Sequence, residues 1–182
     1  IYYPIMEFLD LKTQQKRIRK PLEKRINKIL DHGAYIMGPE VFELEEKLAD
    51  YCGVKHAISC SSGTDALLIP LMAWDIGPGD AVFTTPFTYV ATAEVITILG
   101  ATPVFVDVYE STYNIDCEKL ETEIKRVIKE GKLKPKAIIP VDLFGLPARY
   151  RLIDKIAKKY NLKVIEDAAQ SFGGSIRDKK VG

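Results

Sequence analysis

From about residue 55 onward, short apolar runs of the sequence alternate with helical patterns, and this alternation constrains the fold more than any other feature. Strand-like runs are expected at 56–59, 81–84, 103–108, 137–141 and 163–165, with helices at 64–73, 88–99, 117–129 and 150–160. Such alternation is typical of parallel strands joined by right-handed crossovers. The runs are apolar throughout, as strands buried on both faces must be. We therefore predict an α/β fold with a mostly parallel sheet and helices on both of its faces.

The first fifty residues read as two helices. Apolar residues recur at spacings of three and four between Ile18 and Leu30, Gly33 ends the pattern, and a second helix is expected between Pro39 and Gly53. Lysines and arginines fill the other face of the first helix, which raises nucleic-acid binding as an alternative. We favour a solvated helix face, because acids elsewhere balance the charge and no aromatic residues interleave with the basic ones.

The composition sets outer bounds on the class of protein. With 182 residues, 47% of them hydrophobic, the chain can form one substantial core without disulfides or metals. No internal repeat or low-complexity linker divides it, so we predict that residues 1–182 belong to one domain. The net charge of +1 gives no overall attraction to nucleic acid or to an anionic membrane.

Cysteine and histidine usage indicates a cytoplasmic protein without structural zinc. The three cysteines are an odd number without CxxC spacing, and the two histidines lie far from any paired ligand pattern. The longest apolar stretch, residues 66–74, contains Pro70 and is far too short to span a membrane. Residues 1–5 lack a basic start and a long apolar run, so we expect no signal peptide there.

The first candidate site is the small polar loop around Gly63 and Thr64. These residues open a helix directly after a predicted strand, where free backbone N–H groups and the helix dipole favour an anion such as a phosphate. The alternative is an ordinary helix cap formed by Ser62 or Thr64. The loop is neither a Walker loop nor a dinucleotide-binding glycine fingerprint.

The second candidate is Asp167, which ends the last predicted strand. A partly buried carboxylate there needs a cationic or hydrogen-bonding partner, and the protonated nitrogen of a pyridine ring would be one. The alternative is an acid that caps the following turn. If that turn forms, Gln170 reaches toward the hydroxyl of such a ring. Tyr89 or Phe87 could stack on the ring, although aromatics at such a junction also serve as core.

Together these segments resemble one family. Ser62-Gly63-Thr64-Asp65-Ala66-Leu67, Thr85-Pro86-Phe87-Thr88-Tyr89-Val90-Ala91-Thr92 and Glu166-Asp167-Ala168-Ala169-Gln170 are similar to motifs of the DegT/DnrJ/EryC1/StrS sugar-nucleotide aminotransferases. The resemblance runs from Phe8 to Gly182 and implies the large domain of a fold-type-I pyridoxal-phosphate (PLP) enzyme, present in part. It implies that Gly63 and Thr64 bind the phosphate, that Tyr89 stacks on the ring, that Asp167 holds the ring nitrogen, and that Gln170 contacts the ring hydroxyl.

The resemblance also implies an activity. A cytoplasmic homodimer would move an amino group from an amino acid, with glutamate as the expected donor, to a keto sugar attached to a nucleotide, for polysaccharide or modified-sugar synthesis. The opening Glu7-Phe8-Leu9-Asp10-Leu11-Lys12 and Tyr35-Ile36-Met37-Gly38-Pro39-Glu40 favour amination at C3 over C4. The lysine that would carry PLP as a Schiff base is expected beyond Gly182, so residues 1–182 alone should be inactive. A PLP-dependent sugar dehydratase with histidine in place of that lysine, a nucleotide-dependent oxidoreductase and a non-catalytic regulatory member remain alternatives.

Overall fold

The computed structural model of the protein describes residues 8–182, so the prediction for residues 1–5 lies outside the described part. The described chain forms two compact units, and the boundary between them follows Glu46, within the second helix. The two units are described separately below.

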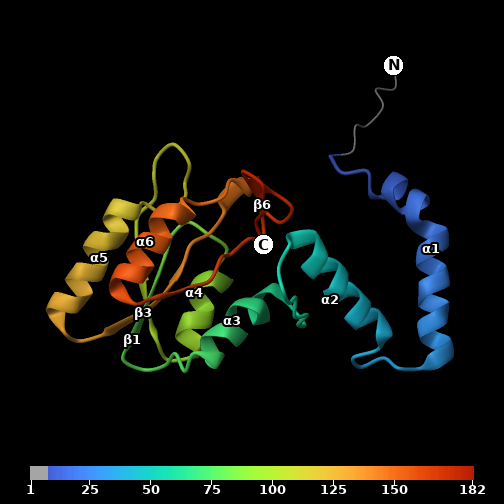
Figure 1. Cartoon of the computed structure of the whole chain (residues 1–182), viewed down its shortest axis with the longest axis horizontal. Coiled ribbons are helices and arrows are strands. Elements are labelled where there is room, and N and C mark those ends of the chain that lie inside the picture. The colour runs from blue at the N-terminus through green and yellow to red at the C-terminus, as the bar shows by residue number, and fades with distance from the viewer. Residues whose placement is uncertain (1–7) are drawn as a thin grey trace, which may run out of the picture. The chain divides into compact units, whose positions relative to one another are not determined.

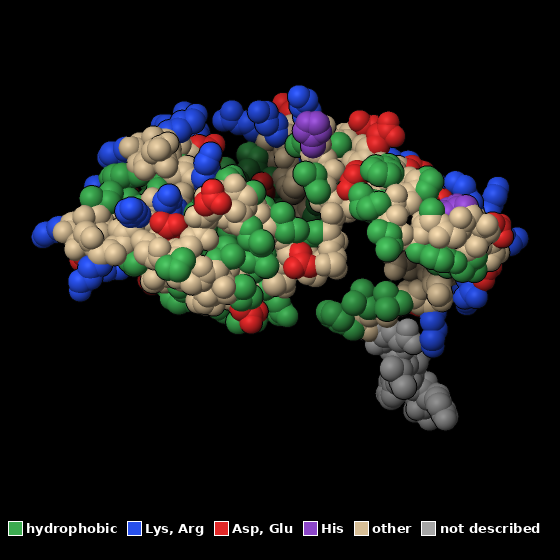
Figure 2. Space-filling model, turned by 90° about the horizontal axis from the view of Figure 1, so that it is seen from below, with side chains coloured by type: hydrophobic (Ala, Val, Ile, Leu, Met, Phe, Trp, Pro, Cys, Tyr) green, Lys and Arg blue, Asp and Glu red, His purple; other side chains and the backbone are tan. Residues whose placement is uncertain are grey.

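The first unit is built from α1 (Leu11–His32) and α2 (Pro39–Cys52), whose first eight residues it contains. The Asp10 carboxylate accepts a hydrogen bond from the backbone N–H of Thr13 at 3.0 Å, and Gly33 ends α1 in the left-handed conformation at φ 66°. No residue in the range Leu11–His32 is buried, and the apolar stripe of α1 is exposed, with Leu22 at 40% and Leu30 at 59%. Figure 2 shows such hydrophobic side chains at the surface among charged ones.

The second unit contains a four-stranded parallel sheet in the order β2-β1-β3-β4, as Figure 1 shows in outline. The strands are β1 (Asp80–Thr84), β2 (Thr102–Phe105), β3 (Lys134–Ile139) and β4 (Lys163–Val164). The helices are α3 (Gly63–Ala73), α4 (Ala91–Ile98), α5 (Cys117–Glu130) and α6 (Tyr150–Tyr160). The predicted fold class is confirmed.

Alternation along the strands divides the core between the two faces of the sheet. Phe83 and Ile138 pack with α5 and α6 in one buried cluster, whereas Val82 and Ile139 pack with α3 and α4 in the other. Figure 1 shows these helix pairs on opposite sides of the sheet. The chain passes from β1 to β2 in one direction and from β2 to β3 and on to β4 in the other. Crossovers of one hand must then place α4 on the face opposite α5 and α6, as observed.

One predicted strand is absent, one predicted helix begins later than expected, and one pair of strands was missed. Residues 56–59 form no strand, because they pair with neither β2 nor β4, the two edge strands of the sheet. Ile58 is accordingly 85% exposed. The helix expected at 88–99 begins only at Ala91, because residues 88–90 form the turn that leads into it. A short antiparallel hairpin, β5 (Ser175–Ile176) with β6 (Lys179–Lys180), was not anticipated. A 3₁₀ turn, η1 (Leu143–Gly145), follows β3.

Candidate active site

The candidate site lies at the point of the sheet where the strand order reverses, between β1 and β3. Strands β1 and β3 are neighbours although β2 lies between them in sequence, and ligands of open parallel sheets bind beyond the carboxyl ends of strands at such a switch point. The hydroxyl of Thr84, the last residue of β1, donates to the carbonyl of Ile139 at 2.9 Å and ties these two strand ends together.

A cavity of about 360 Å³ opens at this edge. It is lined by all five residues singled out from the sequence together with six neighbours: Gly63, Thr64, Leu67, Thr88, Tyr89, Ala91, Thr92, Val141, Asp167, Ala169 and Gln170. The structure therefore brings together residues that lie up to about a hundred positions apart. Their roles toward a ligand stay a prediction.

One part of the cavity lining is the start of α3, where the sequence predicts a phosphate site. Ser62 caps the helix, since its hydroxyl accepts from the Asp65 N–H at 3.1 Å. The N–H groups of Gly63 and Thr64 belong to the first turn, where no preceding carbonyl of the helix can accept them. A Cβ built on Gly63 meets no heavy atom within 4 Å, so the space beside the backbone is open. The sequence reasoning missed the Asp65 carboxylate, which accepts from the hydroxyls of Ser61 and Ser62 and fixes the loop.

Asp167 also lines the cavity and is 9% exposed. Its N–H donates to the carbonyl of Pro140 at 3.0 Å and its carbonyl accepts from the N–H of Asp142 at 3.1 Å, so Asp167 extends the pairing of β3 with β4 by one bridge. Oδ2 of Asp167 accepts from the Thr92 hydroxyl at 2.8 Å, while Oδ1 receives only a long contact of 3.4 Å from the N–H of Ala169. A buried carboxylate therefore lies in the cavity wall with one oxygen weakly engaged.

Gln170 and the aromatic residues occupy different positions around the cavity. The turn expected after Asp167 is present, and Oε1 of Gln170 accepts from the N–H of Phe144 at 2.6 Å, which leaves its Nε2 group to donate. Tyr89 lines the cavity and is 73% exposed. Phe87 does not line it and instead contacts Tyr113, with ring centroids 5.4 Å apart. Of the two aromatic residues considered, only Tyr89 is placed to meet a ring in the cavity.

The other strand-end acids are not in the cavity wall. Asp107 is exposed and its carboxylate accepts from the ammonium of Lys119 at 2.5 Å. Asp142 is fully buried, and its carboxylate accepts from the N–H of Ala148 and from the hydroxyls of Tyr150 and Ser171, at 2.7 to 2.8 Å. Asp142 is therefore a structural anchor.

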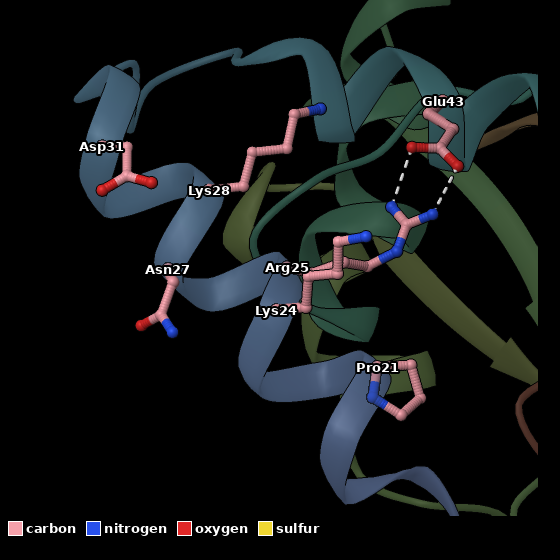
Figure 3. Close-up of a pocket in the computed structure, with 7 residues that line it drawn as sticks. All are labelled: Pro21, Lys24, Arg25, Asn27, Lys28, Asp31 and Glu43. Carbon is pink, nitrogen blue, oxygen red and sulfur yellow. Dashed lines mark hydrogen bonds and ion pairs between the residues drawn. The ribbon is translucent and has the colours of Figure 1, made fainter.

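A larger hollow of about 730 Å³ lies in the first unit, between α1 and α2 (Figure 3). Its cationic side chains are exposed, and the Arg25 guanidinium is taken up by a bidentate pair with Glu43, with both N–O distances at 2.8 Å. No buried polar group points into it from α1, because α1 has no buried residue. We therefore do not assign a site there. Across residues 8–182, no helix has both the length and the apolar character needed to cross a membrane.

Comparison with known proteins first gives the class. The second unit is the α/β arrangement of fold-type-I aminotransferases, and the chain matches solved structures of that class over about half their length. A DegT DnrJ EryC1 StrS aminotransferase from Brucella abortus superposes with a TM-score of 0.95 at 54% identity, covering 97% of this chain and 48% of that one. The PLP form of a sugar aminotransferase from Streptococcus pneumoniae gives a TM-score of 0.74 at 29% identity, covering 88% and 44%.

The family follows from the sequence match. The model of the DegT/DnrJ/EryC1/StrS aminotransferase family matches residues 16–182, and the chain belongs to that family. A UDP-2-acetamido-2-deoxy-3-oxo-D-glucuronate aminotransferase from Pseudomonas aeruginosa is 52% identical over 176 residues, which are 97% of this chain and 47% of that protein. The chain thus spans about half the length of the relatives it matches.

Proposed function

We propose that the full-length protein is a PLP-dependent aminotransferase that transfers an amino group from an amino acid, with glutamate as the preferred donor, to C3 of a nucleotide-linked keto sugar. The observation that carries this proposal is the single cavity that joins the start of α3, Tyr89 and the buried carboxylate of Asp167. Family membership supports the reaction class, and the name of the Pseudomonas relative, a 3-oxo sugar aminotransferase, supports C3.

The residues present fit a phosphorylated pyridine ring. Gly63 and Thr64 offer N–H groups, a hydroxyl and the positive end of the helix dipole to a phosphate. Asp167 offers Oδ1 to a protonated ring nitrogen, Tyr89 offers a ring face, and Gln170 offers its Nε2 group to a ring oxygen. A phosphate needs hydrogen-bond donors and positive potential, and a protonated pyridine nitrogen needs an acceptor, and the residues that line this cavity supply both.

PLP, when bound, supplies an electron sink for the bond-breaking steps of amino transfer. The residues of the chain itself would bind the cofactor, orient its ring and hold a proton on the ring nitrogen. The buried carboxylate of Asp167 would hold a proton on the ring nitrogen. The start of α3 would hold the phosphate, and Tyr89 would cover one face of the ring. No lysine lines the cavity within the described residues, so we place the residue that would bind PLP covalently outside residues 8–182.

We also propose that the full-length protein is a cytoplasmic homodimer. The exposed apolar stripe of α1, which includes Leu22, Ile26 and Leu30, supports a protein partner for the first unit. Sedimentation equilibrium of the full-length protein measures this state, and a monomer at micromolar concentration would contradict it.

The test of the reaction is Asp167→Asn in the full-length protein. Asparagine keeps an oxygen that can accept from Thr92 but cannot hold the ring nitrogen protonated. We expect kcat to fall by roughly a hundredfold or more with folding intact, because the electron sink weakens in the transition state. Asp154→Asn, at an exposed position of α6, is the matched control. Turnover of Asp167→Asn near that of the wild type would refute the assignment.

Borohydride treatment separates the alternatives. Borohydride reduces a Schiff base to a stable amine, so PLP that becomes permanently attached to a lysine of the full-length protein would support the aminotransferase. A protein that binds PLP but is not fixed by borohydride would instead be a dehydratase or a non-catalytic member of the family.

A further inference from the structure

The buried hydroxyl of Thr92 is the feature of the cavity that the proposed function does not use. Thr92 lies in the first turn of α4 and is 1% exposed. Its Oγ1 lies 2.8 Å from Oδ2 of Asp167, across 75 positions of sequence, and 3.0 Å from Oγ1 of Thr88. Both threonines line the cavity. Burying a hydroxyl costs free energy unless the hydroxyl is hydrogen-bonded, and valine would fill the same space without that cost. The hydrogen bonds of Thr92 are therefore the feature that distinguishes it from valine at this position.

Thr88, Thr92 and Asp167 form a series of two hydrogen bonds, and the Asp167 carboxylate determines which group donates in each of them. An ionised carboxylate only accepts, so the single proton of the Thr92 hydroxyl points to Asp167. The bond between the two hydroxyls must then be donated by Thr88. The result is a chain of donors, from Thr88 to Thr92 to Asp167, in which each hydrogen bond strengthens the next.

The hydrogen bonds from Thr88 to Thr92 to Asp167 determine which carboxylate oxygen of Asp167 is available to a ligand. Oδ2 is occupied by Thr92, and among residues 8–182 Oδ1 has only the 3.4 Å contact with the N–H of Ala169. Rotation about χ2 of Asp167 would break the Thr92 bond in a buried place, where a lost partner is costly. The carboxylate plane is therefore fixed before a ligand arrives, which reduces the ordering that binding or reaction has to supply.

We propose that Thr92 is a positioning residue for the reaction, which holds the Asp167 carboxylate in the plane where Oδ1 meets the ring nitrogen of the cofactor. The proposal rests on the proposed function, because it acts through Asp167. Thr88 supports it from one hydrogen bond further away. Loss of the Thr92 hydroxyl should loosen the ring while leaving the phosphate anchor at the start of α3 intact.

The test compares Thr92→Val and Thr92→Ser in the full-length holoenzyme. For Thr92→Val we expect PLP affinity and the KM of the nucleotide sugar to stay near the wild-type values. The visible circular dichroism of the bound cofactor, which reports how firmly the ring is fixed, should weaken. kcat should fall roughly tenfold to a hundredfold, the range of a hydrogen bond to a charged group. Thr92→Ser, which retains the hydroxyl, should restore both signals.

Two controls make the outcome decisive. Thr97→Val makes the same change on α4 at a hydroxyl that donates to the carbonyl of Glu94 instead, and it should behave as the wild type. In an Asp167→Asn background, Thr92→Val should add little to the loss, because the two residues act as one unit. If the valine variant does not fold, Thr92→Ala takes its place in the same comparison.

Wild-type kcat and dichroism in the variant without the hydroxyl would overturn the positioning role, and so would equal losses in Thr92→Ser. Either result leaves the proposed function in place if Asp167→Asn is impaired. Normal turnover in Asp167→Asn itself refutes the proposed function instead.

Discussion

At the scale of single residues, the family motifs located the five candidate positions, and the structure places them around one cavity. Sequence reasoning could not find Thr92, because its partner lies 75 positions away and only the folded sheet brings them together. The available signal was weak: Thr88 and Thr92 are four positions apart, which would put two hydroxyls on one face of the helix expected at 88–99, whereas the helix itself begins only at Ala91.

Replacing Thr64 tests the proposed phosphate-binding role of the start of α3. In the full-length protein, Thr64→Ala should weaken PLP binding roughly tenfold to a hundredfold, because it removes one donor to a charged group. The ring end is untouched, so the absorbance maximum of the bound cofactor should stay the same. Thr122→Ala, at a hydroxyl that donates to the carbonyl of Glu118 on the surface of α5, is the control. Unchanged affinity, measured by spectroscopic titration, would mean that the phosphate lies elsewhere.

We expect Glu166 to make the stability of the protein depend on pH. The pKa of the Glu166 carboxyl is raised to about 7 from a reference value of 4.5. Burial is the main cause, and the nearby carboxylate of Asp142 is the second. Between these values the folded state binds a proton that the unfolded state has released, so this contribution to stability is full below pH 4.5 and is lost as the pH rises through about 7.

Glu166→Gln should remove that loss, because an amide does not titrate. We expect the full-length variant to become more stable relative to the wild type as the pH rises across that window, as guanidinium unfolding would measure. Glu110→Gln, at an exposed site, should follow the wild type. A constant difference between Glu166→Gln and the wild type at all pH values would contradict the raised pKa.

At the scale of elements, most of the fold could be predicted because its strands and helices carry strong periods. The predicted 150–160 helix matches α6 residue for residue, and the 117–129 helix falls one residue short of the end of α5. The segment 56–59 has strand-like residues, but a strand exists only where a neighbour accepts it, which local sequence does not report. The hairpin β5–β6 has two residues in each strand, too few for a period of two to be seen, and its turn contains no glycine.

Asp142 joins three elements, and its replacement tests that role. Its carboxylate links the end of β3 to the start of α6 through Ala148 and Tyr150, and to the turn after β4 through Ser171. Asp142→Asn replaces one accepting oxygen with a donor group in a fully buried place, so the full-length protein should lose roughly 1–3 kcal/mol of unfolding free energy. Ser171→Ala, which removes one of the three donors, should cost less. Urea unfolding that shows no loss in Asp142→Asn would refute the anchor.

At the scale of the whole molecule, residues 1–182 should bind PLP without turning over substrate. The cavity offers noncovalent contacts, but no lysine lines it in the described chain. Lys158 and Lys159 lie in the last turn of α6, where they could react with PLP only nonspecifically. Apolar side chains such as Ile58, 85% exposed, should also make residues 1–182 alone poorly soluble.

Expressing residues 1–182 beside the full-length protein, each with glutamate and a 3-keto nucleotide sugar, measures this difference. Weak PLP binding without amino transfer by the shorter chain is the expected result. Robust transfer by residues 1–182 would place the essential lysine within them and would contradict the position assigned to the site.

The two walls of the cavity also have a consequence for how the sheet unit opens. A ligand that contacts Thr64 at one wall and Asp167 at the other ties together points about a hundred residues apart, so it acts as a removable cross-link. The unfolded chain rarely brings these points together and has little affinity for such a ligand, and the melting temperature should therefore rise with cofactor concentration. With the ligand bound, we expect helix α3 and the turn after β4 to open together, which hydrogen exchange with and without PLP would measure.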